Sequence, residues 1–255
     1  MDGLPILEQD VLSSSPAGPD AGDHLRDDLT ADHPAIERIY VGAAAGGCRV
    51  LAVVGCDAGD SHHVLARLLA ERSARSGDST LLVDLSLPLE SASERVRWMP
   101  GDNRASEAVR PDERGFDRVT ARACLRTAMR FRGIPALRHL FADDLSPYTT
   151  IVVDAGALTG SERAVVPAAT VAQACDGVVL TAAPGAASQR RLQAELEALG
   201  PARSRLVGFV LDDCFQPTVG EELLALGRRL QNKRLRPLAS LVTRIGRWPL
   251  LWERL

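Results

Sequence analysis

The stretch VVGCDAGDSHHVLARLLA, residues 53–70, decides the fold that we expect of this chain. Its apolar start ends at Gly55 and indicates a strand that is buried on both faces. The apolar repeat after Ser61 indicates a helix, and a short loop of small residues that includes Gly59 lies between the two. In such a layout, loop N–H groups and a helix N-terminus face an anion. The stretch therefore predicts an α/β fold with a phosphate-binding type of loop.

The side chains that such a loop needs for catalysis are missing. A lysine normally reaches the terminal phosphates, and a Ser or Thr hydroxyl ligates Mg²⁺. Here His62 and His63 take these two positions. An imidazole is mostly neutral near its unperturbed pKa of about 6.5, and it does not replace an oxygen ligand of Mg²⁺. Because Lys233 is the only lysine of the chain, we predict that ATP hydrolysis by the usual route is lost.

Strands and helices alternate along the rest of the chain, which predicts a mainly parallel sheet with helices on both faces. Residues 86–115 are polar, and we expect them to be irregular. The expected strands are 49–55, 79–85, 116–121, 149–155, 176–183 and 204–213; the expected helices are 61–77, 135–145, 162–174, 187–199 and 218–232.

The stretch that starts at Phe116 has two interpretations. A helix from this point would carry Arg118, Arg122, Arg126 and Arg130 at fourfold spacing. We prefer the alternative, a strand followed by a solvated arginine-rich stretch.

Two acids stand at the ends of expected strands, Asp84 and Asp154. The carboxyl ends of parallel strands are where ligands bind in open α/β folds, so both acids should lie beside the loop. In a working enzyme they would hold Mg²⁺ and orient water. We favour the alternative that they cap the next helix or accept hydrogen bonds from loop amides, because the lysine is absent.

The residues around the loop do not predict a metal site. Cys56, Asp57, Asp60, His62 and His63 are close in sequence, but neighbouring histidines on a helix point about 100° apart and share no ligand face. No zinc spacing is present.

The two ends of the chain differ in charge. We divide the 255 residues into a flexible acidic arm (1–34), a degenerate nucleotide-binding domain (35–232) and a basic amphipathic tail (233–255). The tail places Arg244 and Arg247 beside an apolar face that carries Trp248 and Trp252, which suits a membrane surface or a partner groove. The alternative, a last helix packed on the chain's own domain, stays open.

The compartment follows from what the sequence lacks. The five cysteines are scattered without CxxC spacing, the N-terminus has no secretory signal, and no apolar run is long enough to span a bilayer. We expect a cytoplasmic protein that is either soluble or bound peripherally to a membrane.

Four segments together resemble the cytoplasmic ATPase domain of bacterial tyrosine kinases, a family of the MinD/ParA P-loop group that acts in capsule and exopolysaccharide synthesis. The family's GEGKS or GEGKT motif falls on Gly59, Asp60, Ser61, His62 and His63. The segments are 50–70, 81–88, 146–158 and 175–213.

The family's acidic motifs match only in part. An Asp-x-Asp motif falls on Asp84 and Ser86, so its second acid is missing, and a strand that ends in Asp falls on Asp154. The tyrosine-rich tail of the family is absent as well, since Tyr40 and Tyr148 are the only tyrosines. The resemblance implies a P-loop NTPase-like α/β fold but supports neither kinase activity nor autophosphorylation.

From the residues and the resemblance together, we expect a catalytically inactive scaffold or regulatory subunit of a polysaccharide synthesis and secretion system. Its partner would be an inner-membrane synthase or co-polymerase subunit, with a homo-oligomer left open and no nucleic acid expected. We expect no cofactor, although weak ATP or ADP binding stays open. The alternatives are an active ATPase with a variant histidine loop and a ParA-like positioning protein.

Overall fold

The structure is a computed structural model, and it describes residues 30–56, 62–86, 98–102, 104–121, 125–159, 164, 166–182, 189–211 and 245. All of these except Thr30 and Ile245 belong to one compact unit, which is described below. The expected helix at 218–232 lies outside the described residues, as does the tail apart from Ile245.

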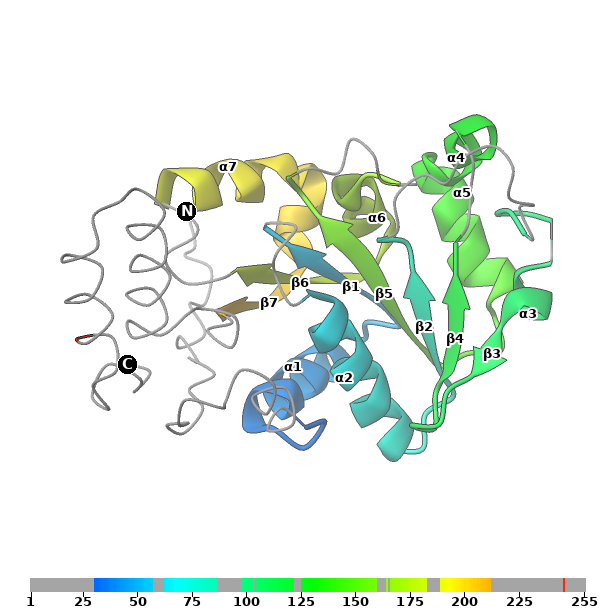
Figure 1. The fold of residues 1–255 in the computed structure, drawn as a ribbon, viewed down its shortest axis with the longest axis horizontal. Helices are drawn as coiled ribbons and strands as arrows, with labels where there is room; N and C mark the ends of the chain where they lie inside the picture. Colours follow the sequence, from blue (N-terminus) through cyan, green and yellow to red (C-terminus); the bar gives the residue numbers. More distant parts are fainter. Residues whose placement is uncertain are drawn as a thin grey trace. The chain divides into compact units, whose positions relative to one another are not determined.

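A mainly parallel sheet forms the centre of this unit (Figure 1). Seven strands in the described residues follow the order β3-β4-β2-β5-β1-β6-β7, and only the β3–β4 pair is antiparallel. The prediction of a mainly parallel α/β sheet is confirmed. The strands are β1 (Val50–Gly55), β2 (Thr80–Asp84), β3 (Arg110–Pro111), β4 (Asp117–Thr120), β5 (Thr150–Ala157), β6 (Gly177–Ala182) and β7 (Leu206–Leu211).

Helices cover both faces of the sheet. The helices α1 and α2 lie on one face, and α5 and α6 lie on the other (Figure 1). The helices are α1 (Pro34–Ala45), α2 (His62–Arg75), α3 (Ala105–Ala108), α4 (Leu125–Phe131), α5 (Ile134–His139), α6 (Ala168–Ala174) and α7 (Gln189–Ala198), with a π-helical turn η2 (Leu140–Asp144) and a 3₁₀ segment η4 (Gly200–Arg205).

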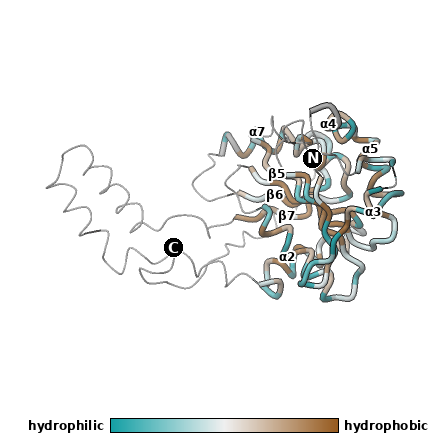
Figure 2. The backbone as a smooth tube through the Cα atoms, turned by 45° about the vertical axis from the view of Figure 1, so that its right-hand side comes forward, coloured by the Kyte–Doolittle hydropathy of each residue, from teal (hydrophilic) through white to brown (hydrophobic). Residues whose placement is uncertain are grey.

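The core explains why the strands have continuous apolar sequences. Every residue of β1, β2 and β6 is buried, because helices or loops cover both faces of these strands. Along β5, Ile151 and Val153 point into the cluster that contains Phe131 and Leu137 on the α4 and α5 side. Figure 2 shows these central strands coloured as hydrophobic.

The sequence prediction was wrong in three places on the α4 and α5 side. Residues 86–115 are not irregular throughout, because α3 and β3 lie within them. The stretch 116–121 contains strand β4, as preferred. The arginine-rich stretch after it was not expected to be helical, but it contains helix α4, on which Arg130 is exposed as predicted. The single helix expected at 135–145 is divided into α5 and the π-helical turn η2.

Residues 31–34 pack on the domain and do not belong to the arm. Ala31 is buried, Asp32 forms an ion pair with Arg75, and His33 caps α1 by accepting a hydrogen bond from the N–H of Ala35 at 3.2 Å. The other expected domain boundaries stay a prediction. Among the described helices, none has the length and apolar character that crossing a bilayer requires.

Candidate functional site

The site begins with two carboxylates on neighbouring strands. Asp84 is the last residue of β2 and pairs directly with Asp154 of β5 in the parallel register. Asp84 is 9% exposed and Asp154 is 5% exposed. Both acids therefore lie at the carboxyl edge of the sheet, as the sequence predicted, and they lie there side by side.

Burial acts strongly on Asp154. Burial, followed by the nearby charge of Asp84, raises the pKa of this carboxyl group to about 7. Three interactions lower this pKa: the hydrogen bond from the Gly156 amide, the charge of His63 and a hydrogen bond from the Ser86 side chain. Near neutral pH the Asp154 carboxyl group therefore holds a proton for part of the time, because its charged form is buried and lies beside the charge of Asp84.

Each acid also accepts hydrogen bonds from the residue two positions further along the chain. Asp84 Oδ1 accepts hydrogen bonds from the Ser86 N–H at 3.2 Å and from the Ser86 hydroxyl at 2.8 Å. Asp154 Oδ1 accepts one from the Gly156 N–H at 3.1 Å. Asp84 thus accepts from an amide beyond the end of β2, and Asp154 from an amide within β5. The interpretation of the two acids as amide-binding groups instead of Mg²⁺ ligands stays a prediction.

Gly156, near the end of β5, allows this strand to approach Ser86 closely. Its φ is +78°, and a Cβ added there would lie 3.3 Å from the Ser86 Cα atom. Ser86 stands where the second acid of the kinase motif would stand. The position is therefore filled by a hydroxyl that is bound to Asp84.

His62 faces the acid pair. It is the first residue of α2 and is 7% exposed, with Nε2 3.7 Å from Asp154 Oδ1. His63 is exposed, and its ring lies edge-on to that of His62 with centroids 5.7 Å apart. As the sequence indicated, the two histidines do not share a ligand face. Within the described ranges, no group of three or more His, Cys, Asp or Glu side chains is arranged to hold a metal ion.

Arg118 of β4 is a member of the site that the sequence analysis missed. One of its terminal nitrogens lies 3.7 Å from Asp84 Oδ2, and the side chain is half exposed. The contact depends on β4 lying next to β2, where Arg118 pairs with Leu82 two positions before Asp84. The order of strands in a sheet is not visible in a local sequence pattern, so Arg118 looked like one solvated arginine among several.

The remaining predicted site residues are not in the described part of the chain. Gly59, Asp60 and Ser61 of the loop lie outside it. So do the tail residues Arg244, Arg247, Trp248 and Trp252. Ile245, between the two arginines, is helical and 36% exposed.

Searches with the sequence found no matching family model and no matching curated protein. The structure, in contrast, superposes on solved kinase domains. The "BceF Tyrosine Kinase Domain" matches with a TM-score of 0.56 and 18% identity over 80% of this chain and 93% of that chain. The fold is that of a bacterial tyrosine kinase domain.

Two further solved chains support this statement about the fold. The kinase domain of the Escherichia coli tyrosine kinase ETK matches with a TM-score of 0.56 and 18% identity, over 80% of this chain and 90% of that chain. The chimerical protein CapA2B2 matches with a TM-score of 0.57 and 15% identity, over 81% and 95% of the two chains. The kinase-domain fold therefore extends over most of the chain.

Within this fold, the described site groups are arranged towards one another. His62 faces Asp154, and Arg118 faces Asp84. Each acid accepts a hydrogen bond from the backbone N–H two residues further along the chain.

Proposed function

We propose that the chain is a catalytically inactive, tyrosine-kinase-like scaffold or regulatory subunit of a bacterial exopolysaccharide synthesis and secretion system. The observation that carries the proposal is the position of His62. This residue takes the place of the phosphate-binding lysine, and its ring is buried beside the Asp154 carboxylate.

The chemistry of nucleotide hydrolysis explains why this observation matters. A phosphate loop works when a long cation reaches the terminal phosphates and a hydroxyl and acids hold Mg²⁺. Here the imidazole is short and lies next to a carboxylate of its own chain, while Arg118 approaches the other acid. A cation within ion-pair distance of Asp84 also opposes the binding of a divalent metal there.

The role in exopolysaccharide secretion rests on the kinase-domain fold together with the motif resemblance. We propose that the arm and the tail make the contacts of the subunit, with an inner-membrane synthase or co-polymerase as the partner. The basic residues and tryptophans of the tail are suited to a membrane face or to a membrane-embedded partner.

Nucleotide binding is the first test. In calorimetry with ATP and with ADP, with and without Mg²⁺, the purified protein should give no binding heat at millimolar nucleotide. The matched control is the double variant His62→Lys/His63→Thr, which restores the lysine and the hydroxyl. Binding by this variant alone would assign the loss to the two histidines, and binding by neither protein would show that the pocket itself has closed.

Micromolar, Mg²⁺-dependent binding by the unmodified protein would overturn the proposal. It would favour the alternative of an ATPase whose histidine loop works with a protonated His62. One observation supports that alternative, because Asp84 and Asp154 remain paired at the strand ends where an ATPase needs its acids.

The tail contact is tested by removing residues 235–255. If the tail holds the protein at the membrane, the truncated protein should move from the membrane fraction to the soluble fraction of lysed cells. Measuring the melting temperature of the truncated protein controls for damage to the domain. An unchanged distribution between the fractions would contradict the membrane contact.

A further inference from the structure

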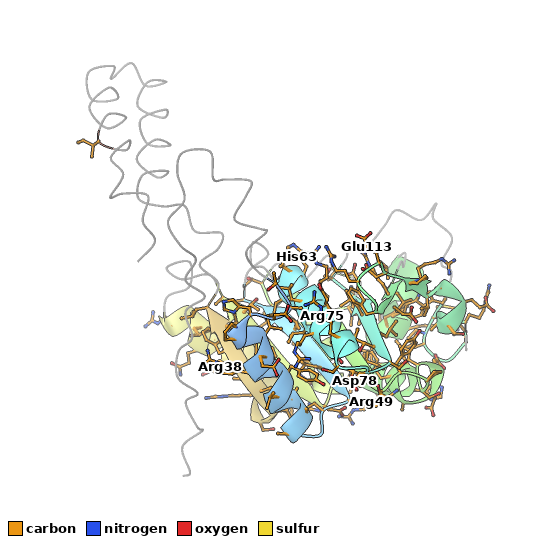
Figure 3. The ribbon with its side chains drawn as sticks, turned by 90° about the horizontal axis from the view of Figure 1, so that it is seen from below. Arg38, Arg49, His63, Arg75, Asp78 and Glu113 are labelled. Carbon is orange, nitrogen blue, oxygen red and sulfur yellow. The ribbon has the colours of Figure 1, made fainter. Side chains whose placement is uncertain are left out.

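A cavity lies at the opposite edge of the sheet from the acid pair. Its volume is about 220 Å³, and it is formed by α1, α2 and the first residues of β1 and β5. The residues of the acid pair stand at the carboxyl ends of their strands, whereas Thr150, in the wall of this cavity, is the first residue of β5. His63 at the start of α2 and Asp78 beyond its end lie well apart in Figure 3.

One side of the cavity is apolar. Leu51 and Val152 come from the sheet and Leu69 comes from α2, and all three side chains are buried. Ala43 and Ala44 of α1 leave the space open because their side chains are small. This side is suited to a short aliphatic or aromatic body.

The other side carries the carboxylate of Asp78, and the hydroxyl groups beside it already donate their protons within the protein. Asp78 Oδ2 accepts hydrogen bonds from the Tyr40 hydroxyl at 3.1 Å and from the Ser73 hydroxyl at 3.0 Å. The Thr80 hydroxyl in turn donates to the Ser73 hydroxyl at 3.0 Å. Because each hydroxyl has only one proton to donate, this wall offers a ligand acceptors and a negative charge.

The arginines closest in sequence to Asp78 form ion pairs with other carboxylates. Arg72 lies over the Tyr40 ring, 4.5 Å from its centroid, and is paired with Glu37. Arg75 is paired with Asp32 and with Glu71. Among the described residues, no arginine or histidine forms an ion pair with Asp78.

The geometry points to a binding site for a small organic cation, a primary amine on a short apolar body, with its ammonium group on Asp78 and its body against Leu51, Leu69 and Val152. A cavity of about 150 Å³ accommodates benzene, so the space here suits about nine non-hydrogen atoms. The site is independent of the acid pair and of any nucleotide.

Cys48 provides a reporter at this cavity. Its thiol lines the space and is partly exposed, and burial, followed by the charge of Asp176, raises its pKa. Alkylation of Cys48 can be followed by peptide mass spectrometry, which separates it from the other cysteines. A ligand in the cavity should slow this reaction.

The experiment compares three probes of similar size and different charge: 2-phenylethylamine, 2-phenylethanol and phenylacetate. The amine should protect Cys48 with a dissociation constant of roughly 0.1–1 mM. The alcohol and the acid should protect about tenfold less or not at all, because neither supplies a positive charge. No protection by about 10 mM amine, or equal protection by the alcohol, would overturn the proposal.

Variants assign the recognition to named residues. Asp78→Asn keeps an acceptor for Tyr40 and Ser73 but removes the charge, so it should weaken amine binding about tenfold. Ala44→Leu keeps a good helix former on α1 and fills the space, so it should abolish protection. Glu107→Gln, an exposed carboxylate on α3, is the matched control and should bind like the unmodified protein. Amine binding that survives both Asp78→Asn and Ala44→Leu would contradict the site.

Discussion

Replacing Asp154 by asparagine should stabilise the protein increasingly as the pH rises from 5 to 8. The pKa of Asp154 is raised from 3.8 to about 7, first by burial and then by the charge of Asp84. In the unfolded chain the carboxyl group loses its proton near pH 4, whereas in the folded protein it keeps the proton until about pH 7. Its stabilising contribution is therefore fully present below pH 4 and is lost as the pH rises towards 7.

The size of the effect follows from the shift in pKa. At about 1.4 kcal/mol per unit, a shift of about three units corresponds to about 4 kcal/mol over the full range, of which about 2–3 kcal/mol falls between pH 5 and 8. Asparagine cannot ionise and keeps an oxygen that can accept from Gly156. The stability advantage of Asp154→Asn over the unmodified protein should therefore grow by about that amount across this interval.

Urea unfolding at several pH values measures this difference directly. Glu107→Gln removes a carboxylate from an exposed position and should show no such growth, so it controls for the change in overall charge. A constant difference between Asp154→Asn and the unmodified protein from pH 5 to 8 would mean that Asp154 ionises normally. The buried Asp154 carboxyl group would then not keep its proton near neutral pH.

The strands could be predicted because their cause is local. In β1 and β2 consecutive apolar residues are buried on both faces, so the pattern is visible within one short stretch. Asp84 and Asp154 were found for the same reason, since each follows an apolar run. The sequence did not predict that the two acids pair directly with each other, because this pairing requires β2 and β5 to be neighbours in the sheet.

The site residues that could not be predicted make their contacts with residues far away in the sequence. Arg118 meets Asp84 only because β4 joins the sheet beside β2. The cavity at Asp78 depends on how α1 packs against α2, and α4 was missed because its arginines looked typical of a solvated stretch. In each case the determining contact lies between elements, where a local pattern contains no signal.

Arg49 is another residue of this kind, and its removal should strongly destabilise the domain. Its guanidinium group donates to three backbone carbonyls in η2 and in the segment after it: Phe141 at 2.8 Å, Leu145 at 2.9 Å and Tyr148 at 3.0 Å. It thereby connects the residue before β1 to the turn that leads into β5. Because these strands are neighbours in the sheet, the contact ties the start of β1 to the segment that enters β5.

Arg49→Ala should lower the free energy of unfolding by about 3 kcal/mol, since three carbonyls lose a charged donor at once. Arg49→Lys is the matched control. It keeps the charge but not the planar fork that reaches three acceptors, so its loss should be smaller but measurable. Urea unfolding of the three proteins measures both values. Equal stability of the alanine variant and the unmodified protein would contradict this prediction. It would mean that water satisfies these carbonyls as well as the guanidinium does, and that the packing of Phe141 and Leu145 alone holds the segment before β5 in place.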